Sequence, residues 1–189
     1  MNELYRETKD VDGVKTTTIY YDNGDVYSES EVGEPFRTYF ELSDVIWRNK
    51  DISSKLAACE ESYKILGEFV RVWMKDSDKL PDTIACRDVG VELYLRLGEW
   101  EKARVAIAKI AAAGAYTDGG VAAVNHYEKY RHAAESALEF LRTNAGFLQR
   151  DIYKALPDID RECLKSFIRS SSLIRKEKFG KTNRLYVRG

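Results

Sequence analysis

Apolar and polar residues alternate in the first part of the chain. β-Branched and aromatic residues are dense on both sides of the polar segment 22–25. Asn23-Gly24 inside this segment suits a two-residue type I′ turn, which needs positive φ angles at both central positions. We therefore predict a β-hairpin with strands at residues 15–21 and 25–30. A lone hairpin is marginally stable in water, so it must lie on the helices or pair with another strand, from this chain or from a second copy.

A helical spacing begins at Leu42 and continues to Trp73. Apolar residues recur along this segment at intervals of three and four when Asn49 is counted in the series. This pattern predicts a long helix, either the central helix of a bundle or a coiled-coil seam between two copies. Additional apolar residues widen the stripe and favour the bundle. A break near residues 49–54 stays open, because Asp51 and Ser53 are both good N-caps.

Two further helices follow the polar loop at residues 76–82 and are separated at Gly98. The phrase LYLRLGEWEKA resembles one tetratricopeptide unit, since its tyrosine, its Leu-Gly turn and its small alanine have the offsets of that motif. No second copy follows at the 34-residue period of that family, so the resemblance implies a repeat-like helical hairpin within a bundle and not a solenoid. A plain pair of antiparallel helices is the alternative.

The next helix is predicted from Val121 to Thr143. One side of it is apolar and is expected to be buried: Val124, Tyr127, Tyr130, Ala134, Ala137, Leu138 and Leu141. The tryptophans also recur at helical spacing and are expected in the core: Trp47, Trp73 and Trp100.

Two short helices and a basic hairpin complete the chain. Residues 148–156 form the first helix, which ends before Pro157 because the residue preceding a proline avoids helical geometry. Asp160 can cap the second helix, 161–170, which has an apolar stripe at intervals of three and four. That stripe is Leu164, Phe167 and Ile168. A strand then begins at residues 173–174, turns at Gly180 and returns.

This order of helix, turn, helix and basic β-hairpin resembles the winged helix-turn-helix superfamily. The phrases that carry the resemblance are LQRDIYKALP, CLKSFIRSSSLIRKEK and GKTNRLYV. The resemblance implies that residues 161–170 form a recognition helix and residues 175–184 a wing. It assigns base edges to Arg161, Lys165, Ser166 and Arg169. It assigns phosphates or the minor groove to Lys176, Lys178, Lys181 and Arg184, and Arg175 at the start of the wing belongs to the same DNA-binding set.

The distribution of charge supports a polyanionic partner independently. From Arg142 onward the chain holds twelve basic and five acidic residues, a net charge of +7, whereas the remainder holds 18 basic and 26 acidic residues, a net charge of −8. Such a division of charge suggests two roles, one of them with a polyanion. Attraction between the two parts of the chain is the alternative. Arginine and lysine can donate to guanine O6 and N7, and Glu162 can accept from cytosine N4.

The sequence offers little for catalysis or metal binding. It has no phosphate-binding loop, dinucleotide fingerprint, zinc-protease motif or nucleophile elbow, so we expect no enzymatic activity and no cofactor. His126 and His132 are six residues apart on a helix and do not form a metal pair. Three distant cysteines predict neither a disulfide framework nor a zinc site, and Cys86 is expected in the core.

The expected fold class is mainly α with small β elements. Three parts are predicted: an N-terminal β-hairpin segment at 1–35, an acidic helical bundle at 36–143 and a basic winged helix-turn-helix domain at 144–189. No run approaches the roughly 18 apolar residues of a membrane span, and the first residues lack the apolar segment of a signal peptide. The expected location is the cytoplasm, with association with the nucleoid as an alternative.

The predicted function is therefore that of a protein that binds double-stranded DNA, and specifically of a transcriptional regulator. The acidic bundle would serve oligomerisation, with a homodimer as one form, or the binding of a protein partner. Two alternatives stay open. Helical repeats followed by a winged helix also occur in scaffold subunits of large assemblies such as the PCI type, which implies a protein-binding role without nucleic acid. The same basic surface would also suit RNA, which the sequence does not separate from DNA.

Overall fold

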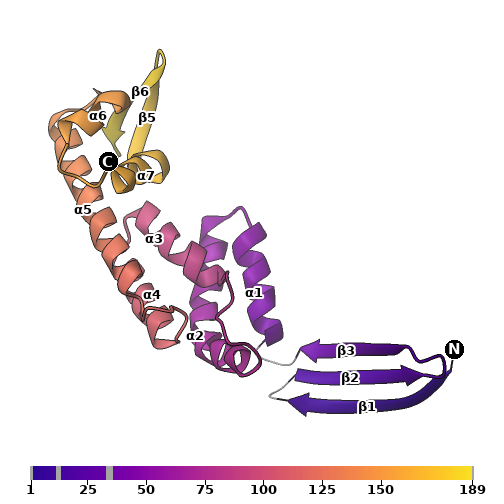
Figure 1. Cartoon of the computed structure of the whole chain (residues 1–189). Coiled ribbons are helices and arrows are strands. Elements are labelled where there is room, and N and C mark those ends of the chain that lie inside the picture. Colours follow the sequence, from indigo (N-terminus) through magenta and orange to yellow (C-terminus); the bar gives the residue numbers. More distant parts are fainter. Residues whose placement is uncertain (1, 12–13, 33–35, 189) are drawn as a thin grey trace.

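The computed structural model describes residues 2–11, 14–32 and 36–188. Helices form most of the molecule, and two small antiparallel sheets complete it, which confirms the predicted fold class. In Figure 1 one sheet projects from one end of the helical body, and the other lies at the opposite end beside the last helices. No helix among the described residues has both the length and the apolar character that crossing a membrane requires.

The N-terminal sheet has three strands in the order β1-β2-β3: β1 (Glu3–Val11), β2 (Val14–Tyr21) and β3 (Val26–Val32). The predicted hairpin corresponds to β2 and β3, and the strand that pairs with it is β1 of the same chain. The sequence pattern did not indicate β1, because charged residues interrupt its apolar alternation.

The predicted two-residue type I′ turn between β2 and β3 is wrong. Gly24 N donates to Tyr21 O, and Tyr21 N donates to Asp25 O, so a longer loop connects the strands, with Gly24 at a φ of 86°.

The long apolar segment is divided into two helices, α1 (Phe36–Arg48) and α2 (Ile52–Asp76). Asp51 caps α2 by accepting from Ser54 N at 2.7 Å. Asn49 lies in the connection, where its side chain accepts from Asp51 N at 2.9 Å. The predicted continuous helix or coiled-coil seam through Asn49 is therefore wrong, and α1 folds back onto α2 instead.

Trp47 was expected in the core, but it is 49% exposed, because it lies at the margin of the apolar stripe of α1.

The next helices are η1 (Cys86–Gly90), a π-helical turn, then α3 (Val91–Leu97), α4 (Trp100–Ala112) and α5 (Val121–Thr143). The break at Gly98 and the bounds of α5 agree with the prediction. Gly90 ends the π-helical turn, and a Cβ at this position would collide with the Tyr63 hydroxyl. That hydroxyl donates to Cys86 O at 3.2 Å. Val124 departs from the expected buried face of α5 and is 46% exposed, near the first turn of the helix.

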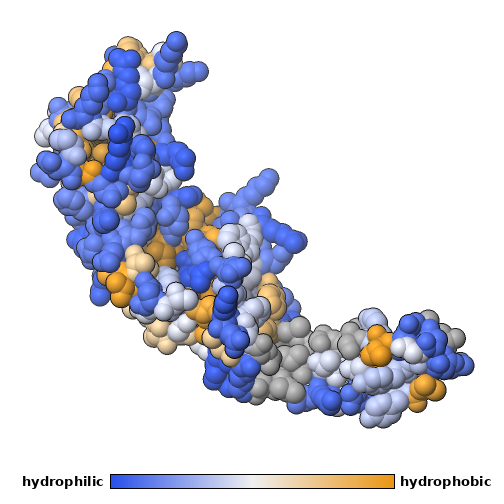
Figure 2. Space-filling view, viewed as in Figure 1, coloured by the Kyte–Doolittle hydropathy of each residue, from blue (hydrophilic) through white to orange (hydrophobic). Residues whose placement is uncertain are grey.

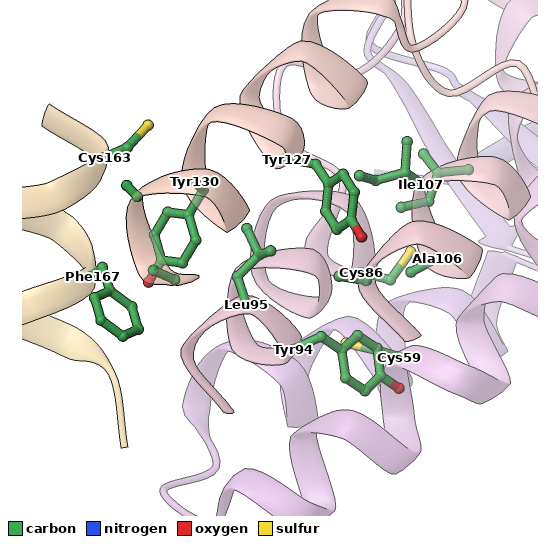
Figure 3. Packing of buried hydrophobic residues seen from close by; sticks show 14 of the residues in the cluster. Cys59, Cys86, Tyr94, Leu95, Ala106, Ile107, Tyr127, Tyr130, Cys163 and Phe167 are labelled. Carbon is green, nitrogen blue, oxygen red and sulfur yellow. The ribbon is translucent and has the colours of Figure 1, made fainter. Parts of the chain in front are cut away.

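Burial accounts for the chemistry of the cysteines. Cys59 and Cys86 are completely buried, and desolvation raises the pKa of each thiol to about 12. A thiol held in the neutral form is a weak nucleophile. Cys86 therefore belongs to the core, as predicted, and Figure 3 shows it among the packed side chains of the helical body.

The C-terminal part contains β4 (Phe147–Leu148), α6 (Gln149–Ala155), α7 (Arg161–Ser170), β5 (Ile174–Phe179) and β6 (Thr182–Val187). Its sheet has the order β4-β6-β5. The bounds of α7 agree with the prediction, α6 is shorter by one residue at each end, and β4 was not expected. Helix α5 packs against α7 and β6 of the C-terminal part and also against α3 and α4 of the helical body, so it connects the two.

Candidate nucleic-acid interface

The orientation of α7 is fixed by its cap and by its apolar stripe. Asp160 accepts from Cys163 N at 2.9 Å, and this backbone hydrogen bond lowers the pKa of the Asp160 carboxyl below its ordinary value. Leu164, Phe167 and Ile168 are at most 1% exposed, as the sequence predicted. Figure 3 shows Phe167 directed at Tyr130 of α5, with the two rings edge to face at a centroid distance of 6.1 Å.

Burial of that stripe directs the opposite face of α7 outward. This outer face consists of Arg161, Glu162, Lys165, Ser166 and Arg169. Arg161, Glu162 and Arg169 are exposed, whereas Lys165 and Ser166 are partly exposed. Lys165 Nζ lies 2.6 Å from Glu162 Oε1, so one of the predicted base-contacting cations is already paired within the helix.

Helix α6 contributes a wall that the sequence analysis did not include. Gln149 and Tyr153 line a hollow of about 290 Å³ together with four residues of α7: Glu162, Lys165, Ser166 and Arg169. The Arg161 guanidinium lies over the Tyr153 ring, 6.0 Å from its centroid. Gln149 also accepts a 2.7 Å hydrogen bond from Asn183 of β6, which connects α6 to the hairpin. The spacing of Gln149 and Tyr153, four residues apart and flanking buried Ile152, is the signal that could have identified this wall.

The β5–β6 hairpin presents two different faces. Successive side chains of a strand point to opposite sides, and directly paired residues share a side. Ile174 and Leu185 are buried on one side, and Lys176 and Lys178 follow on that same side toward the tip. Lys176 Nζ donates to Arg169 O at 2.6 Å, so the side of the hairpin that carries the lysines adjoins the end of α7. Burial, followed by repulsion from Arg169, lowers the pKa of Lys176.

The other side of the hairpin carries the arginines. Arg175 lies over the ring of Tyr186 at 4.6 Å from its centroid, and Arg184 lies over the ring of Phe179 at 4.2 Å. Phe179 is 49% exposed at the tip, where it supports Arg184. The structure therefore brings Lys176 and Lys178 to the side of α7, and it places Arg175 and Arg184 on the reverse side.

Most of the predicted cations are exposed to solvent. The exposed ones are Arg161, Arg169, Arg175, Lys176, Lys178, Lys181 and Arg184. In Figure 2 the surface at this end of the molecule is mostly hydrophilic. Glu162 and Glu177 are the acidic residues from position 161 to position 188, so positive charge dominates the surface of α7 and the hairpin. Arg188 follows β6 and is also exposed.

The outer face of α7 adjoins α5, because His126 lines a hollow together with Glu162 and Ser166. His126 and His132 are exposed on α5. Among residues 2–11, 14–32 and 36–188, no three His, Cys, Asp or Glu side chains gather in a way that could hold a metal ion.

No family model, no curated protein and no solved structure matches the chain. The candidate interface therefore rests on the geometry of α6, α7 and the β5–β6 hairpin.

Proposed function

We propose that this chain is a DNA-binding protein in which residues 144–189 act as a winged helix-turn-helix unit. In this proposal α7 enters the major groove as the recognition helix, and the β5–β6 hairpin is the wing. The order of α6, α7 and the hairpin is the order that the sequence resemblance implies. A B-DNA major groove admits one α-helix, and cationic side chains along that helix can reach guanine O6 and N7.

The proposal depends on one observation: α7 buries its apolar stripe, and its opposite face, which bears the cations, is turned toward solvent. Lys165, Ser166 and Arg169 occupy that face, and Lys176 is held beside its end by the bond to Arg169 O. Lys178 continues the same side toward the hairpin tip. A helix and a hairpin that present cations on one side can meet base edges and phosphates together.

The reverse side of the hairpin has a separate role in the proposal. Arg175 and Arg184 are stacked on aromatic rings, which orients their guanidinium groups away from α7. In the proposal, this side of the hairpin meets the phosphate backbone next to the groove that α7 enters. These arginines therefore contribute to affinity through phosphate contacts, whereas α7 supplies sequence selectivity. Transcriptional regulation is the cellular role that we infer from selective duplex binding.

The decisive experiment is a charge reversal with a matched control. Lys165→Glu combined with Arg169→Glu removes two cations from the outer face of α7, and we expect it to abolish binding of a short duplex in a gel-shift assay. Lys64→Glu combined with Arg71→Glu makes the same change of net charge on α2, where Lys64 pairs with Glu61 as Lys165 pairs with Glu162, and Arg71 lies 3.8 Å from Glu68. This control should leave duplex binding intact. Equal losses in both variants, or none in the first, contradict the proposal.

Salt dependence provides a second measurement on the unaltered protein. Neutralising about five phosphates gives a slope near −4.5 in a plot of the logarithm of affinity against the logarithm of salt concentration. A titration from about 50 to 200 mM salt with random duplex should therefore weaken binding steeply. Replacing the duplex by single-stranded RNA of the same length compares the two nucleic acids directly.

A protein-binding scaffold is the alternative function. Phe40 and Trp47 are both 49% exposed on α1, and they lie seven residues apart, so they form an aromatic stripe on the helical body. Exposed apolar groups of this kind suit a protein partner. In that role the molecule shows no salt-sensitive binding to duplex at physiological ionic strength, which the titration distinguishes.

A further inference from the structure

Strand β1 leaves an open edge on a sheet that has little apolar cover. The order β1-β2-β3 places one side of β1 on β2 and leaves the other side unpaired within the sheet. Leu4, Tyr5, Val26 and Tyr27 are each more than half exposed. An exposed strand edge is a template for pairing, and small sheets need additional strands or a packed face for stability. The free edge of β1 is therefore suited to pairing with a further strand.

We propose that β1 pairs antiparallel with β1 of a second copy of this chain, about a two-fold axis that passes through Thr8. The two sheets then form one continuous sheet of six strands. The contact is isologous, so it closes as a dimer and does not propagate. This interaction is independent of the proposed DNA-binding function, because it uses none of the residues of α7 or of the β5–β6 hairpin.

The charge pattern of β1 selects this partner and this register. The segment Arg6-Glu7-Thr8-Lys9-Asp10 reads as cation, anion, neutral, cation, anion, and its reverse has the opposite sign at every charged position. With Thr8 opposite Thr8 of the second copy, Arg6 lies opposite Asp10 and Glu7 lies opposite Lys9. Each pair occurs twice by symmetry, so four opposite-charge pairs form. Opposite charges directly across a strand pair are stabilising.

Neighbouring registers lose this complementarity. A symmetric shift by one position in either direction places Glu7 opposite Glu7 or Lys9 opposite Lys9, and like charges directly across a pair are destabilising. In the register centred on Thr8, even-numbered residues lie opposite even-numbered residues and odd-numbered opposite odd-numbered. Opposed side chains therefore lie on the same face of the sheet, as the pleat requires. One register therefore satisfies both the backbone geometry and the charges.

The other edge of the sheet does not offer such a match. The β3 sequence VYSESEV contains Glu29 and Glu31 and no cation. Pairing between two copies of β3 therefore gains no opposite-charge pair from this composition. This asymmetry between the edges explains why the proposed contact closes at β1 and does not extend the sheet through β3.

The single chain already holds part of this charge set in weak local pairs. Arg6 lies 2.9 Å from Glu3, and Lys9 lies 3.3 Å from Glu7, with the side chains of Arg6 and Lys9 55% and 70% exposed. Exposed pairs of this kind contribute little to stability. The exposed cations Arg6 and Lys9 can therefore turn to Asp10 and Glu7 of the second copy, and Glu7 keeps the 3.2 Å hydrogen bond that it accepts from the Tyr20 hydroxyl.

A charge-swap series tests the register. The 189-residue chain should have twice its own mass of 21.7 kDa at micromolar concentration in multi-angle light scattering. Lys9→Glu turns two opposite-charge pairs into like-charge pairs and should raise the dissociation constant of the dimer about tenfold or more. Adding Glu7→Lys restores complementarity and should restore the dimer. A monomeric unaltered protein, or a double variant as weak as Lys9→Glu, overturns the proposal.

Cross-linking tests the position of the axis. Thr8→Cys places two thiols directly opposite each other, at a Cβ separation of roughly 4.5–5.5 Å that small backbone shifts bring into the range of a disulfide. The native cysteines Cys59, Cys86 and Cys163 are buried, so the introduced thiol is the reactive one. We expect a covalent dimer after mild oxidation of Thr8→Cys and none for Tyr27→Cys on the other edge. A cross-link through Tyr27→Cys in place of Thr8→Cys overturns the β1 assignment.

Discussion

Gly98 shows at the level of one residue how the helical body accommodates the C-terminal part. Its φ is 76°, and it ends α3 by donating from its backbone N–H to Leu95 O at 3.2 Å. A Cβ at this position would lie 2.7 Å from Leu173 Cδ1. Leu173 belongs to the segment between α7 and β5, which also bonds to α3 through Ser172 N and Arg96 O at 3.0 Å. The absence of a side chain at Gly98 therefore permits a tertiary contact as well as a turn.

Substitution of this glycine should destabilise the protein. Gly98→Ala meets the left-handed backbone cost of roughly 1–2 kcal/mol and adds a collision with Leu173, so we expect a loss of at least that size in urea unfolding. Gly67→Ala in α2 is the matched control, because its Cβ would have no neighbour closer than 3.9 Å. Alanine in a helix interior should stabilise by about 0.5–1 kcal/mol. A loss of stability in both variants contradicts this account of Gly98.

Some residue-level features were predictable and others were not. Asp160 was identified as a cap, and Leu164, Phe167 and Ile168 as a buried stripe, because local spacing determines both. Trp47 was misplaced, since helical spacing cannot distinguish the centre of an apolar stripe from its margin. The stacking of Arg175 and Arg184 on aromatic rings depends on the strand register, which the sequence does not define.

At the level of elements, local patterns predicted the helices well and the strands less well. Helices α5 and α7 have the predicted bounds, because Gly120 and Asp160 mark their beginnings. The break between α1 and α2 was left open, since the apolar spacing continues through Asn49 and only the capping geometry reveals the division. Strand β1 was missed because its residues are mostly charged, and β4 because it has two residues.

The cap of α7 makes the stability of this element depend on pH. The Asp160 carboxylate accepts from Cys163 N, and its pKa is lowered, so the charged form stabilises the folded state. This contribution is complete above the ordinary aspartate pKa of about 3.9 and is lost as the pH falls through the lowered pKa. We expect Asp160→Ala to reduce the melting temperature at pH 7, and the difference from the unaltered protein to shrink toward pH 3. A difference that is constant over this range contradicts the assignment.

At the scale of the whole molecule, one apolar core connects the acidic helical body to the basic C-terminal part. The cluster of buried residues extends from Tyr39 in α1 to Leu185 in β6 without division. Tyr130 of α5 lies at the junction, with its ring 6.5 Å from that of Trp100 and 6.1 Å from that of Phe167. The charge division at Arg142 therefore describes the surface, while the interior is shared. Two parts with opposite charge and a common core are expected to unfold together.

The tryptophans make this expectation measurable, because all of them precede residue 144. Phe167→Ala empties a completely buried position in α7 and should cost about 3–5 kcal/mol. In a cooperative molecule this loss shifts the denaturation midpoint reported by tryptophan fluorescence, although the altered residue lies in a part without tryptophan. Phe179→Ala at the exposed hairpin tip is the control and should leave the midpoint unchanged. If Phe167→Ala shifts the helical circular dichroism signal and leaves the tryptophan transition in place, the two parts unfold separately and the shared core does not couple them.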